Sequence, residues 1–135
     1  MANLNEVCAS VINDVDEALA AAVVDLHSGL LLGVAHNVPY FTQTYLDAVA
    51  AAAVDMFRGK SVRNIEKLIA SMRGSEPHPL INEVQFVTEK TYHFLTLVPN
   101  KPNAMAMLVT SKRANMGMGW ASLRAKLPDI EPFCP

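Results

Sequence analysis

The sequence predicts a single α/β domain, in which helices cover both faces of a five-stranded antiparallel sheet. Its 135 residues match the usual size of one domain. Apolar residues recur with helical spacing in four segments, and five other segments are short apolar runs typical of strands. The strand-like runs come as a pair and then as a group of three joined by short loops, which favours antiparallel pairing.

A helix and a hairpin are predicted at the N-terminus. Residues 4–15 place apolar side chains along one face of a helix. Residues 18–25 are rich in alanine, which also suits a helix, but their β-branched pair and the turn that follows favour a strand. The predicted hairpin loop is 26–29, where Gly29 can take a positive φ. The returning strand, 30–35, is apolar almost throughout, so we expect it to be buried on both faces.

A long central helix is predicted over residues 42–58. Thr44 and Asp47 have the spacing of a capping box, and Gly59 suits the C-terminal end. This helix is apolar almost all round, so we expect both of its sides to be covered. One side can pack on the chain's own sheet, and the other side requires a second subunit or a further helix.

The C-terminal half continues with a second helix, a polar linker, three strands and a final helix. The final helix is expected to stop at Pro128, which cannot continue it, and to leave a short tail over 128–135. A loop is expected around 99–103. The predicted elements are a helix over 62–72, a linker over 74–79, strands over 82–88, 91–98 and 104–110, and the last helix over 115–127.

The composition favours a cytoplasmic protein with an interface. Hydrophobic residues make up 51% of the chain and charged residues 18%, more apolar than average. The longest apolar run, 48–54, is too short to enter a membrane as a span, and the N-terminus lacks the pattern of a secretion signal. A net charge of −2 gives no general attraction to nucleic acid or anionic lipid. We therefore expect the apolar surplus to form a protein interface.

No motif indicates catalysis, a cofactor or a metal. Residues 58–61 resemble part of a phosphate-binding loop, but Val54 occupies the place of its first glycine. Cys8 lies on the apolar stripe of the first helix and Cys134 in a proline-rich segment, so neither suggests a nucleophile. Metal-ligand spacing is absent from the four histidines, His27, His36, His78 and His93. We expect a protein that is not an enzyme.

A basic segment follows the central helix. It holds five of the chain's 11 basic residues within sixteen positions, opposed by Glu66 alone. Such a run forms either a solvated helix face or a docking patch for an acidic protein surface. If it docks a partner, the residues expected to contact that partner are Arg58, Lys60, Arg63 and Lys67.

Three stretches resemble the roadblock / dynein light chain family, of the bacterial type, whose fold is profilin-like. Residues 22–32 look like its first hairpin, and the alanine-rich helix 45–57 looks like its central helix. Residues 108–119, with Leu-Val-Thr followed by Asn-Met-Gly-Met-Gly, look like the end of its last strand and the start of its last helix. The minimal family domain passes from the central helix straight to the third strand, whereas residues 60–79 here insert a helix and a linker.

The resemblance implies a binding module without catalytic residues. Members form homodimers or heterodimers through their central helices and third strands, and many serve as platforms or regulators of Ras-like small GTPases. By resemblance, this chain would pair with itself or with a roadblock-like paralogue, and a small GTPase is the further partner suggested. The residues expected at the dimer interface are Tyr45, Val49, Ala52, Ala53, Met56, Asn82, Val84 and Phe86.

A small-ligand sensor is the alternative from a different functional class. The chain is rich in methionine, which fills core gaps and also lines adaptable binding surfaces. A sensor would need an apolar pocket between the sheet and the last helix. The residues expected to line it are Met105, Met107, Met116, Met118, Tyr92, His93 and Phe94.

Overall fold

The computed structural model describes residues 3–135 and confirms the expected fold class. One five-stranded sheet has the strand order β2-β1-β5-β4-β3, and all neighbouring strands are antiparallel. In chain order the elements are α1 (Leu4–Asp14), β1 (Ala18–Asp25), β2 (Leu31–His36), α2 (Gln43–Arg58), α3 (Lys60–Arg73), β3 (Glu83–Val87), β4 (Thr91–Val98), β5 (Lys101–Ser111), α4 (Met116–Ile130) and the short 3₁₀ helix η1 (Glu131–Phe133).

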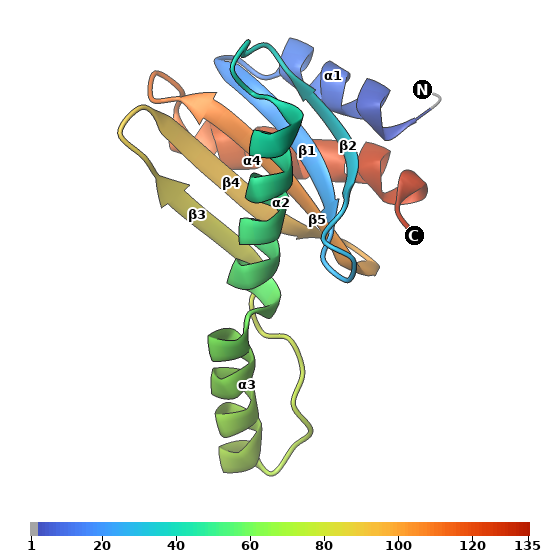
Figure 1. Ribbon diagram of the computed structural model, residues 1–135, viewed down its shortest axis with the longest axis vertical. Coiled ribbons are helices and arrows are strands. Elements are labelled where there is room, and N and C mark those ends of the chain that lie inside the picture. The colour runs from blue at the N-terminus through green and yellow to red at the C-terminus, as the bar shows by residue number, and fades with distance from the viewer. Residues whose placement is uncertain (1–2) are drawn as a thin grey trace.

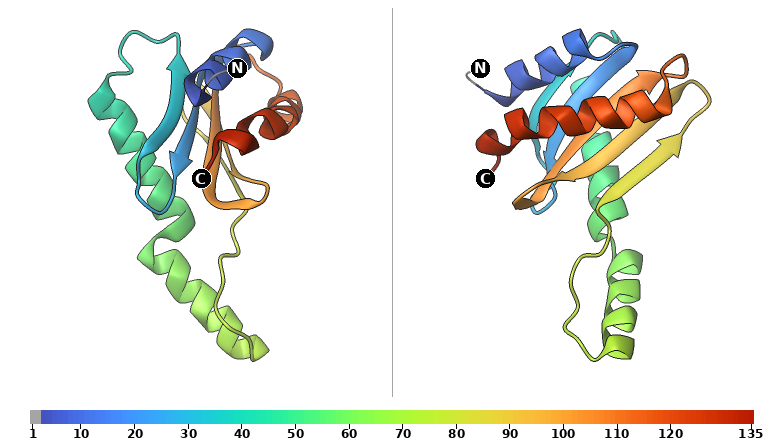
Figure 2. Two further views of the ribbon diagram at one scale, coloured as in Figure 1. Left: turned by 90° about the vertical axis from the view of Figure 1, so that its right-hand side faces the viewer. Right: turned by 180° about the vertical axis from the view of Figure 1, so that it is seen from behind.

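The helices are divided unequally between the two faces of the sheet. Helices α1 and α4 lie side by side on one face, and α2 lies alone on the other (Figures 1 and 2). Because side chains alternate along a strand, consecutive residues of β4 enter different cores. Phe94 packs with the α1 and α4 side chains, and Leu95 packs with those of α2.

The first hairpin forms where it was expected, but the environment of its second strand differs from the prediction. The Asp25 carboxylate accepts hydrogen bonds from His27 N–H (3.0 Å) and Ser28 Oγ (2.8 Å), and Gly29 has a φ of +77°. The prediction that residues 30–35 are buried on both faces is wrong. Strand β2 is an edge strand, and most of its side chains are half-buried.

The predicted ends of two helices also need correction. The N-cap of α2 is Thr42, whose Oγ1 accepts from the Tyr45 N–H at 3.3 Å, so Thr44 lies inside the first turn and forms no capping box. Helix α4 continues through Pro128 to Ile130. Residues 128–135 are therefore not a free tail, because Ile130 and Cys134 are buried in the core beside α1.

The inserted segment projects away from the sheet. Helix α3 follows α2 after Gly59, roughly continues its direction, and leads into an extended return segment (Figures 1 and 2). We call residues 60–79 the arm. Its return segment is fixed to α3 by Glu66, a buried carboxylate that accepts the Leu80 N–H at 2.8 Å. Because the arm extends beyond the sheet, it does not cover the outer side of α2.

Candidate protein–protein interface

One face of the sheet is covered by a single helix and has room for a second. Five strands spaced about 4.8 Å apart make a sheet on the order of 20 Å wide, and packed helices lie about 10 Å apart, so two helices are needed to cover each face. The face of α1 and α4 meets this requirement, whereas α2 alone covers the opposite face (Figure 2). There, Val84 and Phe86 of β3 remain half-exposed. The bare area is about the width of one further helix.

Strand β3 forms the edge of the sheet beside this bare area. It pairs with β4, and among the described residues no strand pairs with its outer edge. An unpaired edge offers N–H and C=O groups to another chain. Its alternate side chains face α4, where Gln85 accepts from Trp120 Nε1 at 2.9 Å and Glu83 pairs with Arg124 at 2.8 Å. Both edge and face are therefore open to a partner on the α2 side.

The flank of α2 that faces β3 carries an apolar stripe. Tyr45, Val49, Ala52 and Met56 follow helical spacing along one side of the helix. Tyr45 lines a groove together with the β3–β4 turn, whereas Val54, on the opposite flank, lies near Gly29 of the first hairpin. The stripe therefore borders the bare part of the sheet.

Six of the eight residues expected at a dimer interface thus lie on one continuous surface. We call it the α2–β3 surface, and it consists of Tyr45, Val49, Ala52, Met56, Val84 and Phe86. Ala53 is 1% exposed and packs beneath α2 on its own sheet, so it is not accessible to a second chain. Asn82 precedes β3 and is exposed, and its carbonyl accepts the Leu97 N–H at 3.0 Å.

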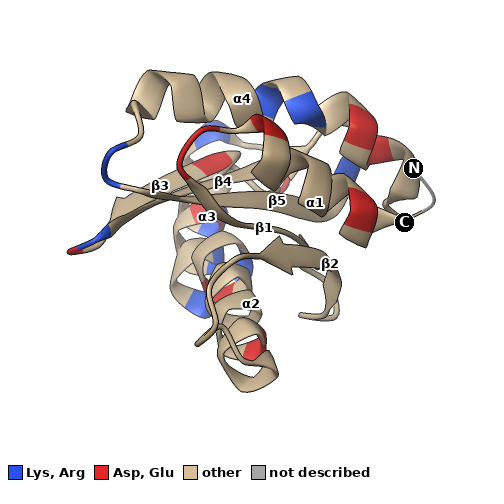
Figure 3. Cartoon of the chain, turned by 90° about the horizontal axis from the view of Figure 1, so that it is seen from above, with Lys and Arg blue, Asp and Glu red and all other residues tan. Residues whose placement is uncertain are grey.

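The basic segment found in the sequence forms the end of α2 and much of α3, and Figure 3 shows basic residues there as well as on α4 and in loops. Arg58 Nη2 donates to the Pro102 carbonyl at 2.6 Å, and its buried Nη1 has no hydrogen-bond partner in the described structure. Arg58, Arg63 and Lys67 line a hollow of about 270 Å³ between α3 and residues 77–79. Lys60 is exposed and does not line this hollow. Three of the four expected docking residues therefore share one hollow.

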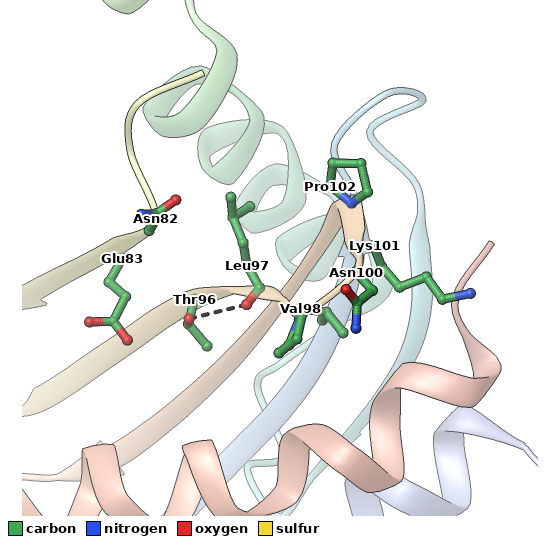
Figure 4. A pocket seen from close by; sticks show the side chains of 9 residues that line it. Asn82, Glu83, Thr96, Leu97, Val98, Asn100, Lys101 and Pro102 are labelled. Atoms are coloured by element: carbon green, nitrogen blue, oxygen red, sulfur yellow. Dashed lines mark hydrogen bonds between the residues drawn. The ribbon is translucent and has the colours of Figure 1, made fainter. Parts of the chain in front are cut away.

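The hollow at the β4–β5 turn is larger, about 550 Å³, but it holds no converging reactive groups (Figure 4). Lys101 reaches away from it to the Cys134 carbonyl (2.9 Å), and the Glu83 carboxylate is engaged by Arg124. Thr96 Oγ1 donates to the Leu97 carbonyl at 3.2 Å. The polar groups are already satisfied by the chain itself, so this hollow does not have the character of an active site.

Among the described residues, no pocket lined by the residues expected for a ligand sensor forms between the sheet and α4. A hollow of about 320 Å³ lies beside the start of α4, but Met118 is the only expected residue among those described that lines it. Gly119 of α4 lies so close to the Phe94 ring that an added Cβ would come within 2.5 Å of it. Strand alternation separates the expected lining residues: Met105, Met107 and His93 face α2, whereas Tyr92 and Phe94 face α4. On α4 itself, Met116 and Met118 are exposed to solvent. The structure thus contradicts this predicted pocket.

The titratable groups of the described residues also give no reaction centre. Burial raises the pKa of the Cys8 thiol to about 12 and raises that of Cys134, which opposes thiolate formation at neutral pH. Among residues 3–135, no cluster of three or more acidic, histidine or cysteine side chains could hold a metal ion. Over the same residues, no helix is both long and apolar enough to cross a bilayer.

Two features of the surface were not predicted from the sequence: an aromatic cluster at the start of α2 and the exposure of the apolar stripe of α3. An aromatic cluster stands before and within the first turn of α2, where Phe41 stacks on Tyr45 with ring centroids 4.7 Å apart and Tyr40 is 73% exposed. The apolar stripe of α3 is largely exposed at Ile65, Leu68 and Met72. The adjacent aromatic pair after Pro39 was the available signal for the first feature. The exposure of the α3 stripe depends on the direction in which the arm projects, and no local sequence pattern gives that direction.

Comparison with known proteins places the fold. No protein-family model matches the sequence, and no significant match is found among curated protein sequences. Solved structures are nevertheless similar over nearly the whole chain. A Roadblock/LC7 domain from Streptomyces avermitilis shares 14% identity, with 98% of each chain covered and a TM-score of 0.68. Myxococcus xanthus MglB shares 14% identity, with 94% of this chain and 90% of that chain covered and a TM-score of 0.66.

A structure of MglB with a tetrameric arrangement extends this likeness. It shares 16% identity, covers 96% of this chain and 85% of its own, and has a TM-score of 0.71. The likeness of the whole fold therefore agrees with the resemblance found in the sequence. The chain has the roadblock/LC7 fold.

Proposed function

We propose that the protein is a dimerising roadblock-type module that binds and regulates a partner protein without chemistry of its own. The observation that carries this proposal is the half-covered face of the sheet. The α2–β3 surface presents half-buried apolar side chains beside an unpaired strand edge. A second α2, placed on the bare area, would supply the missing helix and remove that apolar surface from water.

A two-fold axis is the simplest symmetry for such pairing. In an isologous dimer the same patch is used by both copies, and with the two-fold axis perpendicular to α2 this helix would lie antiparallel to the partner's α2. The outer edge of β3 would then come near the partner's β3, with which it can form a ladder. A paralogue of the same fold would meet the same surface, so the pairing permits a homodimer or a heterodimer.

The proposed partner beyond the dimer is a Ras-like small GTPase. This proposal is supported by the likeness to MglB and by the family resemblance of the sequence. The hollow lined by Arg58, Arg63 and Lys67 shares no lining residue with the α2–β3 surface. Its charge suits an acidic surface on the partner and would mainly speed their encounter.

Solution mass, measured by light scattering, tests the pairing. We expect wild type to be a dimer at micromolar concentration and Ala52→Glu to be a folded monomer, because the glutamate would bury a charge in the interface. Ala51→Glu is the matched control. Ala51 is also exposed, but it is turned about 100° away from the stripe, so this variant should remain dimeric. A monomeric wild type, or equal effects of both substitutions, would contradict the proposed surface.

A further inference from the structure

The arm carries an apolar stripe that its own chain leaves open. Ile65, Leu68 and Met72 are 57%, 62% and 79% exposed and lie along one side of α3. The return segment covers a different side, where Glu66 and Ala70 are buried. Large apolar side chains gathered on one face of a projecting helix are typical of a binding surface.

A groove of suitable character lies at the far end of α2. It has a volume of about 270 Å³ and lies between the start of α2 and the β3–β4 turn at residues 88–91. Buried Phe41 and Val109 contribute apolar lining, and exposed Tyr40 and Tyr45 extend it toward solvent. An amphipathic helix docks in such a groove by its apolar stripe.

The arm cannot reach the groove of its own chain. Leu68 lies 23 residues after Tyr45, and α3 roughly continues the direction of α2 (Figures 1 and 2). At 1.5 Å per helical residue, the two side chains stand about 35 Å apart. The arm and the groove thus lie at opposite ends of the rod formed by α2 and α3. An antiparallel partner would bring each arm to the other copy's groove.

Two positions of the two-fold axis along the α2 stripe both place α3 of one copy at the start of α2 of the other. If the two-fold axis passes near Ala52, Ile65 comes opposite position 39 of the partner. An axis near Met56 places Leu68 opposite position 44. Both positions border the aromatic cluster at the start of α2.

Charge complementarity also favours the antiparallel arrangement. The start of α2 and the adjacent turn carry Asp47 and Glu89, with a single lysine, Lys90. The arm carries Arg63 and Lys67. Antiparallel pairing brings these basic residues toward the acidic end of the partner, whereas parallel pairing would set like charges side by side.

We propose that two copies of this chain exchange arms, so that the apolar stripe of each α3 docks in the groove between α2 and the β3–β4 turn of the other copy. This inference rests on the pairing proposed for the α2–β3 surface. It extends that interface to both ends of the rod. It also gives the inserted segment a role in self-association.

Cross-linking between two single-cysteine variants tests the exchange. Leu68→Cys and Tyr45→Cys would be mixed, allowed to exchange subunits, and treated with a short bismaleimide. The native Cys8 and Cys134 are buried, and wild type treated alike reports their background. We expect a covalent dimer in the mixture and far less in either variant alone. A product from Leu68→Cys alone would mean that the arms pair with each other, and this would overturn the proposal.

The affinity of self-association gives a second readout. Leu68→Glu should weaken dimerisation roughly tenfold or more, the effect of losing a buried interface anchor. Because Leu68 is exposed in the single chain, this variant should fold normally. Met118→Glu, an equally exposed apolar position on the opposite face of the sheet, should leave the affinity unchanged.

The combined outcomes separate this inference from the proposed function. If wild type is a dimer that Ala52→Glu disrupts, but cross-linking and Leu68→Glu have no effect, the arm exchange is wrong and the α2–β3 pairing stands. If wild type is monomeric, both proposals fail. A 68–45 cross-link with a weakened Leu68→Glu dimer supports both.

Discussion

The substitution Gly119→Ala tests how closely α4 packs on the sheet. An added Cβ would stand 2.5 Å from Phe94 Cζ and 2.9 and 3.0 Å from two neighbouring ring carbons, whereas carbon atoms normally pack 3.5–4.0 Å apart. Helix or ring must therefore move by about 1 Å. Phe94 is fully buried and held edge-on by Trp120, with centroids 5.2 Å apart, so it has little freedom to yield.

The expected magnitude follows from two opposing effects. Overpacking a rigid site costs about 1–3 kcal/mol, and replacing glycine by alanine inside a helix returns about 1 kcal/mol. We expect a net loss of up to about 2 kcal/mol in the free energy of unfolding, whereas the same substitution at an open site would give a gain of about 1 kcal/mol. Urea denaturation at one fixed protein concentration measures it, because self-association also shifts the midpoint.

Gly117→Ala is the control within the same helix. Gly117 is exposed, and its added Cβ would meet only the Asn115 side chain at 3.3 Å, so this variant should show no overpacking loss and a gain of at most about 1 kcal/mol. If Gly119→Ala is instead more stable than wild type by about 1 kcal/mol, space must exist between α4 and Phe94. The reasoning against a ligand pocket on that side would then be refuted.

Two further predictions concern the arm and the α2 side of the core. Glu66→Leu should leave the half-buried Leu80 N–H without its acceptor, at a cost of up to about 1–3 kcal/mol. Amides of the arm should then exchange with deuterium faster, whereas Glu66→Gln keeps an acceptor and most of the protection. Burial lowers the pKa of His93 below its ordinary 6.5, so the unfolded chain takes up the proton first and stability should fall as the pH drops below about 6.5. Urea midpoints at pH 7 and pH 5 measure this loss. His93→Phe, which can keep the stack on Phe86, should show a smaller loss, and an equal loss in both would assign it to other groups.

Most of the fold could be predicted because local patterns and short loops agree with it. The four main helices and five strands were expected at nearly their observed positions, since period and turn chemistry act within a few residues. Predictions about burial were weaker. Strand β2 has the apolar sequence of a central strand, but its place at the edge depends on β5, which follows it by about seventy residues. Helix α4 passes Pro128 because Ile130 and Cys134 are buried by α1, a contact that local propensity does not record.

The candidate site shows the same division between local and distant information. The α2 stripe follows from helical spacing, and its neighbours Val84 and Phe86 follow from strand alternation. That Ala53 belongs to the core and Ala52 to the surface required the direction in which α2 faces the sheet. The groove beside Tyr45 could not be predicted, because its walls come from α2 and from a turn more than forty residues later.

The position of the exposed apolar residues explains the apolar surplus of the sequence. A chain of this size can bury its apolar side chains in one domain, yet the start of α2 and the arm expose five large ones: Tyr40, Tyr45, Ile65, Leu68 and Met72. The other large exposed side chains lie scattered over the hairpin, β3, α4 and η1, as single apolar residues commonly do. Those five lie at the two ends of one rod. In a single chain each end stays in water, whereas the proposed antiparallel second copy would bury both ends at once, so the proposed self-association would account for the surplus.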